Sequence, residues 1–213
     1  QYTSGEMMRT KNFYLLLATM FFGLISYFMV SPVSQTYQID LGIPSAVAVS
    51  AVMLGSIVNA GARLVLPTLA DKVGRIVCIK GVLIVAVIAM GVLAVSRSLA
   101  VTVAVVLMYG CYGGIMGSFP SLTSSIFGMK HTGENYGFVM FGIVFATFGA
   151  PAISGLVSSN GYEMNVVFGI GAVFAVIAFV CLTLLGRNLV KEHAEKSAGV
   201  KKDTAQIRKP QAE

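Results

Sequence analysis

Six long apolar segments, separated by short polar stretches, dominate the chain. They run approximately over residues 13–34, 45–69, 76–96, 99–120, 135–158 and 164–186. Each is long enough to supply the ~20 apolar residues with which an α-helix crosses a bilayer. The pattern predicts an all-α membrane protein with a polar linker at 1–12, a six-span domain at 13–186 and a charged tail at 187–213. We expect that tail to be disordered beyond a short helical extension.

The composition supports a membrane protein and argues against other classes. Hydrophobic residues make up 56% of the chain and charged residues only 11%, with a mean hydropathy of +0.81. A soluble domain carries roughly a quarter charged residues, so the lipid bilayer is the expected solvent. The net charge of +6 does not predict a nucleic-acid partner, because the basic residues gather in the loops and the tail.

The distribution of basic residues predicts the topology. Thirteen of the fifteen lysines and arginines lie in the N-terminal segment, the second loop, the fourth loop and the tail, whereas the opposite loops hold only Arg97. Loops rich in Lys and Arg stay in the cytoplasm. We therefore expect a multi-pass protein of the plasma (inner) membrane with both termini cytoplasmic.

Arg63 is the one basic residue that lies well away from either end of an apolar segment. It stands eight residues before Asp71, which places it roughly 12 Å above the end of its helix at the α-helical rise. A cation at that depth costs at least ~2.5 kcal/mol unless it faces a cavity or a partner. No acidic residue lies within the six segments, so we expect an anionic substrate as partner. Alternatively, Arg63 snorkels to the interface or bonds to carbonyl groups and Asn59, which lies one turn earlier on the same face.

A charged turn follows, from Asp71 and Lys72 through Gly74 to Arg75. Gly74 is able to adopt a positive φ in a tight connection. Asp71 is able to cap the next helix or pair with a neighbouring cation. A solvated loop on the positive side is the alternative interpretation.

The fourth segment is rich in glycine and tyrosine. Two GxxxG patterns interlock there and predict close helix packing; their members are Gly110, Gly113, Gly114 and Gly117. Tyr109 and Tyr112 are candidates to line a substrate cavity, or they only pack. The three cysteines have no metal-type spacing, and no catalytic triad or phosphate loop appears. We expect no enzyme, no metal and no cofactor.

The turn resembles the loop signature of the major facilitator superfamily, G-x-L-a-D-(R/K)-x-G-R, with Pro67 in place of the first glycine. Three segments in order resemble the C-terminal half of its oxalate/formate antiporter family, which includes pyruvate- and lactate-type carriers. They are NAGARLVLPTLADKVGR at 59–75, GSFPSLTSSIFG at 117–128 and NYGFVMFGIVFATFGAP at 135–151.

The resemblance implies half of a twelve-helix fold, built from two three-helix repeats, whose N-terminal six-helix half is missing or separate. It implies that Arg63 contacts a substrate carboxylate and that the charged turn latches a cytoplasmic gate. Oxalate-type members carry a lysine where this chain has Ile143, so a monocarboxylate such as formate, lactate or pyruvate is favoured over oxalate.

We therefore predict secondary active transport of a small organic anion by alternating access. Asn59, Arg63, Tyr109 and Tyr112 are expected at the substrate, and Asp71, Lys72, Gly74 and Arg75 at the gate. A six-span anion channel with a ring of Arg63 side chains is one alternative. A membrane sensor or scaffold that does not transport is another.

Overall fold

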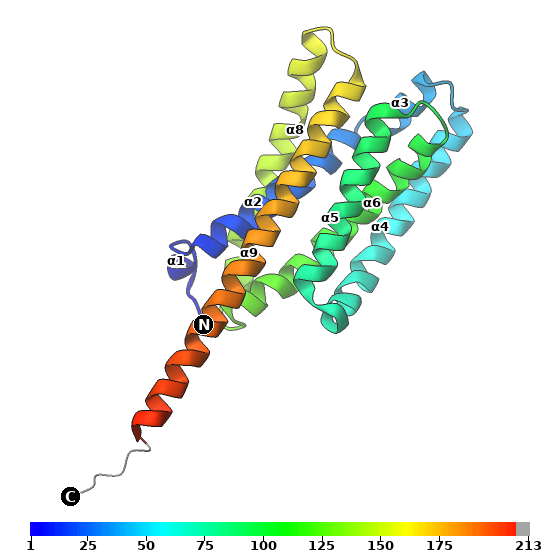
Figure 1. The fold of residues 1–213 in the computed structure, drawn as a ribbon. Helices are drawn as coiled ribbons and strands as arrows, with labels where there is room; N and C mark the ends of the chain where they lie inside the picture. The colour runs from blue at the N-terminus through cyan, green and yellow to red at the C-terminus, as the bar shows by residue number, and fades with distance from the viewer. Residues whose placement is uncertain (208–213) are drawn as a thin grey trace, which may run out of the picture.

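The computed structural model describes the backbone of residues 1–207 and, except for residue 193, the side chains through residue 194. That part of the chain is helical and contains no strand (Figure 1). The helices are α1 (Ser4–Met7), α2 (Lys11–Val30), α3 (Ser34–Asp40), α4 (Ser45–Val73), α5 (Arg75–Val95), α6 (Ala100–Phe127), α7 (Thr132–Val139), α8 (Phe141–Ser159) and α9 (Met164–Ile207).

The predicted set of six membrane spans is confirmed. Six helical segments are long and apolar enough to cross a bilayer, with α7 and α8 together forming the fifth. Two helices continue past the apolar segments that predicted them: α4 through Pro67 to Val73, and α6 through Pro120 to Phe127. Proline is tolerated inside membrane helices because neighbouring helices and side chains satisfy the freed carbonyl groups.

The last helix extends well beyond its apolar part. Helix α9 runs past Arg187 to Ile207, so the helical extension is longer than the short one expected. Residues 208–213, where the predicted tail ends, lie outside the described residues.

The helices pack as two equivalent sets of three. Helix α4 packs on α6 as α8 packs on α2, and α5 packs on α6 as α9 packs on α2. The α5–α9 and α2–α6 contacts map onto themselves when the sets α2–α4–α5 and α6–α8–α9 are exchanged, and the α4–α5 contact maps onto α8–α9. Two three-helix repeats related by a pseudo-two-fold axis give this pattern, which agrees with the predicted half of a twelve-helix fold.

Glycine residues of α6 bring its backbone against α4. A Cβ atom on Gly113 would collide with the carbonyl oxygen of Asn59, and one on Gly117 would lie 2.7 Å from the carbonyl oxygen of Arg63. The predicted close packing of the fourth span is therefore confirmed, and its partner is the helix that carries Arg63. Pro67 has no N–H to donate to that Arg63 carbonyl, so the missing Cβ of Gly117 gives the freed oxygen room.

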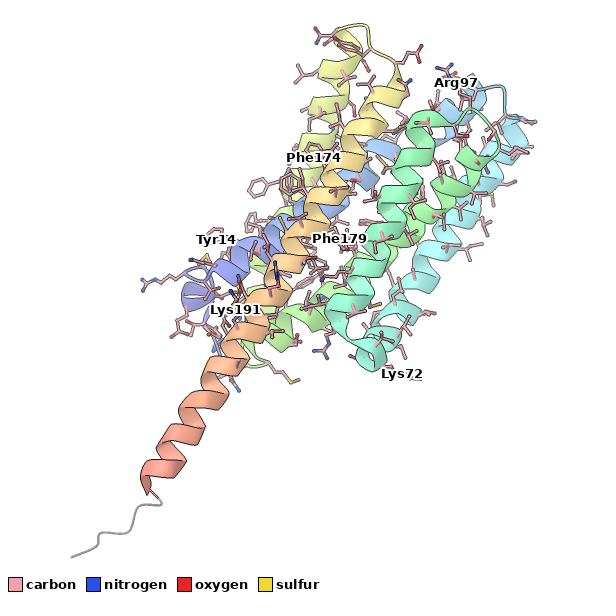
Figure 2. All side chains as sticks on the ribbon, viewed as in Figure 1. Tyr14, Lys72, Arg97, Phe174, Phe179 and Lys191 are labelled. Atoms are coloured by element: carbon pink, nitrogen blue, oxygen red, sulfur yellow. The ribbon has the colours of Figure 1, made fainter. Side chains whose placement is uncertain are left out.

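The connections divide between the two ends of the bundle. At one end, the Tyr2 N–H donates to the Phe127 carbonyl at 2.9 Å, joining the N-terminal segment to the α6–α7 connection. At the other end, Arg97 pairs with Glu163 at 2.8 Å across the α5–α6 and α8–α9 connections. Figure 2 shows Arg97 at the opposite end from Lys72 and Lys191. Lys72 and Lys191, which belong to two of the segments richest in basic residues, thus lie at one end of the bundle. The topology predicted from the loop charges requires this arrangement.

Two spans are covered least by the rest of the bundle. Only 11% of the most apolar stretch of α4 is buried, and 22% of that in the α7–α8 span, compared with 61% in α2. These faces are apolar and must meet lipid or another protein segment.

Candidate functional site

Arg63 and Asn59 lie on one face of α4, one turn apart. The Nε atom of Arg63 donates a hydrogen bond to Oδ1 of Asn59 at 3.2 Å. The side chain of Asn59 is half-buried, whereas that of Arg63 is exposed. The alternative that Arg63 bonds to Asn59 therefore holds for one of its five N–H groups.

An aromatic ring covers the guanidinium group of Arg63. Its Cζ atom lies 5.4 Å from the centroid of the Tyr112 ring, which belongs to α6. Such cation–π contacts contribute ~0.5–1 kcal/mol at exposed sites. Tyr112 stacks in turn on Tyr27 of α2, with ring centroids 4.2 Å apart and planes 12° apart. Three helices thus position this one cation.

Tyr109 lies deeper in the same aromatic cluster. Its ring meets Tyr27 edge-on at 5.3 Å, and its hydroxyl lies 3.4 Å from Oγ of Ser34. Only 7% of the residue is exposed. Gly55 of α4 gives the ring room, since a Cβ atom there would lie 3.0 Å from the Tyr109 ring. Tyr109 is therefore buried within the aromatic cluster, whereas Tyr112 contacts Arg63 directly.

Arg63 forms no ion pair with any described side chain. Beyond the Nε bond to Asn59, its terminal nitrogens have no hydrogen-bond partner in that part of the chain. Two parallel N–H donors on a planar guanidinium match the two oxygens of a carboxylate. The arrangement is thus able to bind a carboxylate at an exposed, cationic position in the membrane span.

One tyrosine beside the Arg63–Tyr112 pair was undervalued in the sequence. Tyr27 had no feature beyond a polar group in an apolar segment, yet it contacts both Tyr109 and Tyr112. Tyr136 of α7, in the NYG motif that carries the family resemblance, is half-buried and packs against the apolar core. Ile143, in α8, is half-buried and packs against the apolar core.

The charged turn is tighter than the sequence indicated. Helix α4 continues to Val73 and α5 starts at Arg75, so Gly74 alone forms the turn, with φ 106° and ψ 131°. The positive φ expected for Gly74 is confirmed. Of the roles that the sequence left open for Asp71, the structure shows the pairing with a nearby cation. Asp71 accepts a hydrogen bond from Arg75 at 3.2 Å, one helical turn away, whereas α5 has no side-chain cap, and Lys72 is exposed.

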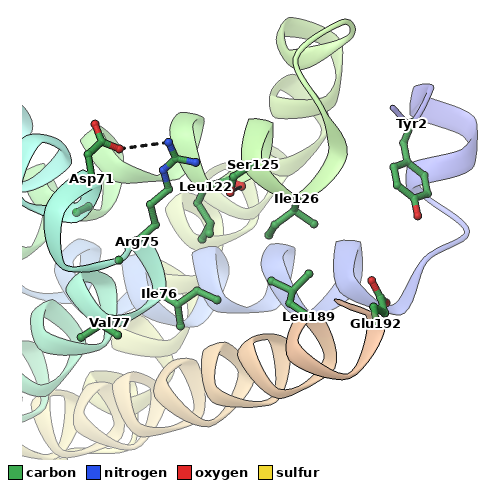
Figure 3. A pocket seen from close by; sticks show the side chains of 12 residues that line it. Tyr2, Asp71, Arg75, Ile76, Val77, Leu122, Ser125, Ile126, Leu189 and Glu192 are labelled. Atoms are coloured by element: carbon green, nitrogen blue, oxygen red, sulfur yellow. Dashed lines mark hydrogen bonds and ion pairs between the residues drawn. The ribbon is translucent and has the colours of Figure 1, made fainter. Parts of the chain in front are cut away.

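A cavity of about 550 Å³ lies beside this turn. The turn, α6, α9 and the N-terminal segment all contribute to its lining (Figure 3). Arg75 and Asp71 are joined by their ion pair at one part of it, and Tyr2 and Glu192 lie at another. Three of the four residues predicted to form a gate, Asp71, Gly74 and Arg75, therefore line a cavity to which α6, α9 and the N-terminal segment also contribute.

Comparison with known proteins gives the class. The model of the Major Facilitator Superfamily matches residues 3–147, more than half of the chain. The chain therefore belongs to this superfamily of membrane transporters, and it is not an enzyme. Among the described residues, no group of His, Cys, Asp and Glu side chains is arranged to hold a metal ion.

Two curated relatives support the narrower resemblance. The chain is 26% identical over 187 residues to the oxalate:formate antiporter of Oxalobacter formigenes, covering 86% of this chain and 44% of that protein. It is 32% identical over 144 residues to the uncharacterized MFS-type transporter YhjX of Escherichia coli (strain K12), covering 66% of this chain and 36% of that protein. The chain spans less than half the length of either relative.

Proposed function

We propose that this chain is the C-terminal six-helix half of a secondary active transporter that moves a small organic anion by alternating access. The observation that carries the proposal is Arg63, an intramembrane cation with no acidic partner among the described residues. A charged residue within a membrane span normally marks a substrate or ion pathway. A bound carboxylate would provide the missing countercharge.

A monocarboxylate such as formate, lactate or pyruvate is the proposed substrate class. The antiporter relative acts, by its name, on oxalate and formate. This chain has the apolar Ile143 where oxalate-type members have a lysine. A second carboxylate would therefore lie in the site without its cation, and an unpaired charge out of water costs several kcal/mol. A single carboxylate needs only Arg63.

The turn from Asp71 to Arg75 is proposed as the cytoplasmic gate, with Lys72 and Gly74 between its charged ends. The Asp71 and Arg75 side chains are 61% and 35% exposed. Ion pairs at such exposure contribute at most ~1 kcal/mol. A contact of this strength is suited to a latch that must open and close in every transport cycle.

The proposed setting is the plasma (inner) membrane, with both termini cytoplasmic according to the positive-inside rule. Residues 1–12 would act as a cytoplasmic linker, 13–186 as the half-transporter and 187–213 as a cytoplasmic tail. The uncovered faces of α4 and α8 would pack against the N-terminal six-helix half, with the anion held between the halves near the bilayer midplane.

Replacing Arg63 in the complete transporter tests the proposal. In proteoliposomes loaded with formate, uptake of labelled formate, lactate, pyruvate and oxalate should saturate, with the monocarboxylates preferred. Arg63→Ala should abolish uptake, because the substrate loses its only countercharge. Arg97→Ala, at the exposed Arg97–Glu163 pair of the opposite end, is the matched control and should retain it. Unchanged uptake by Arg63→Ala would remove Arg63 from the site, and non-saturating conductance would instead support the channel.

A further inference from the structure

An apolar groove opens between α4 and α5, and α6 forms its floor. Helix α4 packs mainly on α6 and only lightly on α5, although Gly74 alone connects α4 to α5. The groove has a volume of about 490 Å³ and is lined by aliphatic side chains, glycines and the thiols of Cys78 and Cys111. Each thiol lies 3.5 Å from a backbone carbonyl oxygen to which it donates, so the walls of the groove are apolar.

The groove follows one face of α4 along the membrane span. The residues of α4 that line it recur every three or four positions from Val58 to Val73, a length of about 22 Å at the α-helical rise. The hydrocarbon part of one leaflet is about half of ~30 Å. The groove is therefore long enough to hold one extended acyl chain over its whole length.

The groove is separate from the site around Arg63. Arg63 directly follows Ala62, which lines the groove. Consecutive residues of an α-helix are turned by about 100° around its axis. The Arg63 side chain accordingly leaves α4 in another direction, toward the ring of Tyr112. A molecule bound in the groove would not occupy the position proposed for the substrate.

A cation without a counterion stands at one end of the groove. Lys72 directly precedes Val73, and Leu69 lines both the groove and a depression of about 350 Å³ to which Lys72 also contributes. Lys72 is exposed, and its ammonium group has no ion-pair or hydrogen-bond partner in the described part of the chain. The neighbouring Asp71 is paired with Arg75. Figure 2 shows Lys72 where α4 turns into α5.

An apolar groove that ends at an unpaired cation matches an anionic phospholipid. A lysine at the membrane surface attracts an anionic headgroup, and its methylene stem is able to lie along apolar surface while the ammonium group reaches the interface. We propose that the α4–α5 groove binds an anionic phospholipid, with one acyl chain between α4 and α5 and the headgroup phosphate at Lys72. This lipid site goes beyond the proposed transport of an organic anion.

Lipid binding to the complete transporter tests the headgroup contact. Native mass spectra, recorded as the transporter is titrated with phosphatidylglycerol or with zwitterionic phosphatidylcholine, give the Kd of the first bound lipid. The wild type should bind phosphatidylglycerol about fivefold more tightly, the effect of one lysine near an anionic headgroup. Lys72→Gln should remove this preference and leave phosphatidylcholine binding unchanged. A preference that persists in Lys72→Gln, or no preference in the wild type, would refute the headgroup contact.

Two glycines of α5 provide a matched pair of variants for the acyl-chain contact. Gly81 lines the groove, Gly91 does not, and a Cβ atom at either position meets nothing within 4 Å. Gly81→Leu should fill the groove without a collision and lose the high-affinity phosphatidylglycerol complex. Gly91→Leu should retain that complex, and both variants should melt near the wild-type temperature. Equal phosphatidylglycerol binding by the two variants would overturn the position of the acyl chain.

A protein segment in the groove is the competing outcome. If the wild type forms no phosphatidylglycerol complex, and Gly81→Leu separates the two halves of the transporter or changes the number of associated copies, the groove is a protein interface and the lipid site is refuted. The exposed Lys72→Gln substitution tests the site even if Gly81→Leu lowers the melting temperature. Formate uptake does not enter these measurements, so their failure leaves the proposed function standing, and failure of the Arg63→Ala test leaves the lipid site standing.

Discussion

Arg63 is held in the bundle by neutral groups. One amide oxygen and one aromatic ring contact its guanidinium group. The ring contributes ~0.5–1 kcal/mol, whereas a central arginine costs at least ~2.5 kcal/mol on insertion scales. The two contacts position the cation and leave much of that cost to be offset. An anion that binds at the terminal nitrogens would offset it.

Arg63→Lys should transport formate with a higher KM than the wild type in spite of its positive charge. A lysine is a point charge without the planar fork that matches a carboxylate, and it would also leave the Asn59 Oδ1 atom without its Nε donor. We expect at least a tenfold rise in the KM for formate, measured as uptake into proteoliposomes. Wild-type kinetics in this variant would show that charge alone suffices and that the fork geometry is irrelevant.

At the scale of helices, the α4–α6 pair is the element on which the site depends. Gly113 and Gly117 bring the α6 backbone against Asn59 and Arg63, and the same helix presents Tyr112 to the guanidinium. A change in the separation of these two helices would therefore alter the position of Arg63 relative to Tyr112. The GxxxG pattern would then shape the proposed binding site as well as the packing.

Gly113→Ala should destabilise the bundle. Its Cβ would collide with the Asn59 carbonyl, which is backbone and cannot rotate away. Overpacking of this kind costs roughly 1–3 kcal/mol, and the melting temperature in detergent should fall by several degrees. Gly91→Ala in α5 is the control, because a Cβ there meets nothing within 4 Å; it should melt at or slightly above the wild-type temperature. Equal melting temperatures for the two variants would show that α4 and α6 separate freely.

The spans could be predicted from the sequence because a run of apolar residues determines where a helix crosses a membrane. The ends of α4 and α6 were less predictable, since Pro67 and Pro120 suggest a break that the surrounding helices prevent. Arg63 and Asn59 were found because a cation and an amide are rare in such segments. Tyr27 was no more than a weak candidate, because nothing local shows which of several tyrosines joins the aromatic cluster beside Arg63. Only the packing of α2 and α4 on α6 provides that information.

At the scale of the whole molecule, the two faces that the fold leaves uncovered belong to equivalent helices. Helices α4 and α8 occupy the same place in the two three-helix sets, and both have low burial. Arg63 lies exposed on one of them. In a functioning transporter this side must be closed, because a substrate that is open to lipid or water cannot be passed from one side of the membrane to the other.

This chain alone should therefore show negligible transport. Reconstituted into formate-loaded liposomes, the 213-residue protein should take up labelled formate no faster than its Arg63→Ala variant, because Arg63 has only half of an enclosed site around it. Supplying the N-terminal half should restore saturable exchange in the wild type and leave the variant inactive. Robust, saturable uptake by the chain alone would contradict this. It would mean that copies of the chain enclose the site together, whereas uptake that does not saturate would support the channel with its ring of Arg63 side chains.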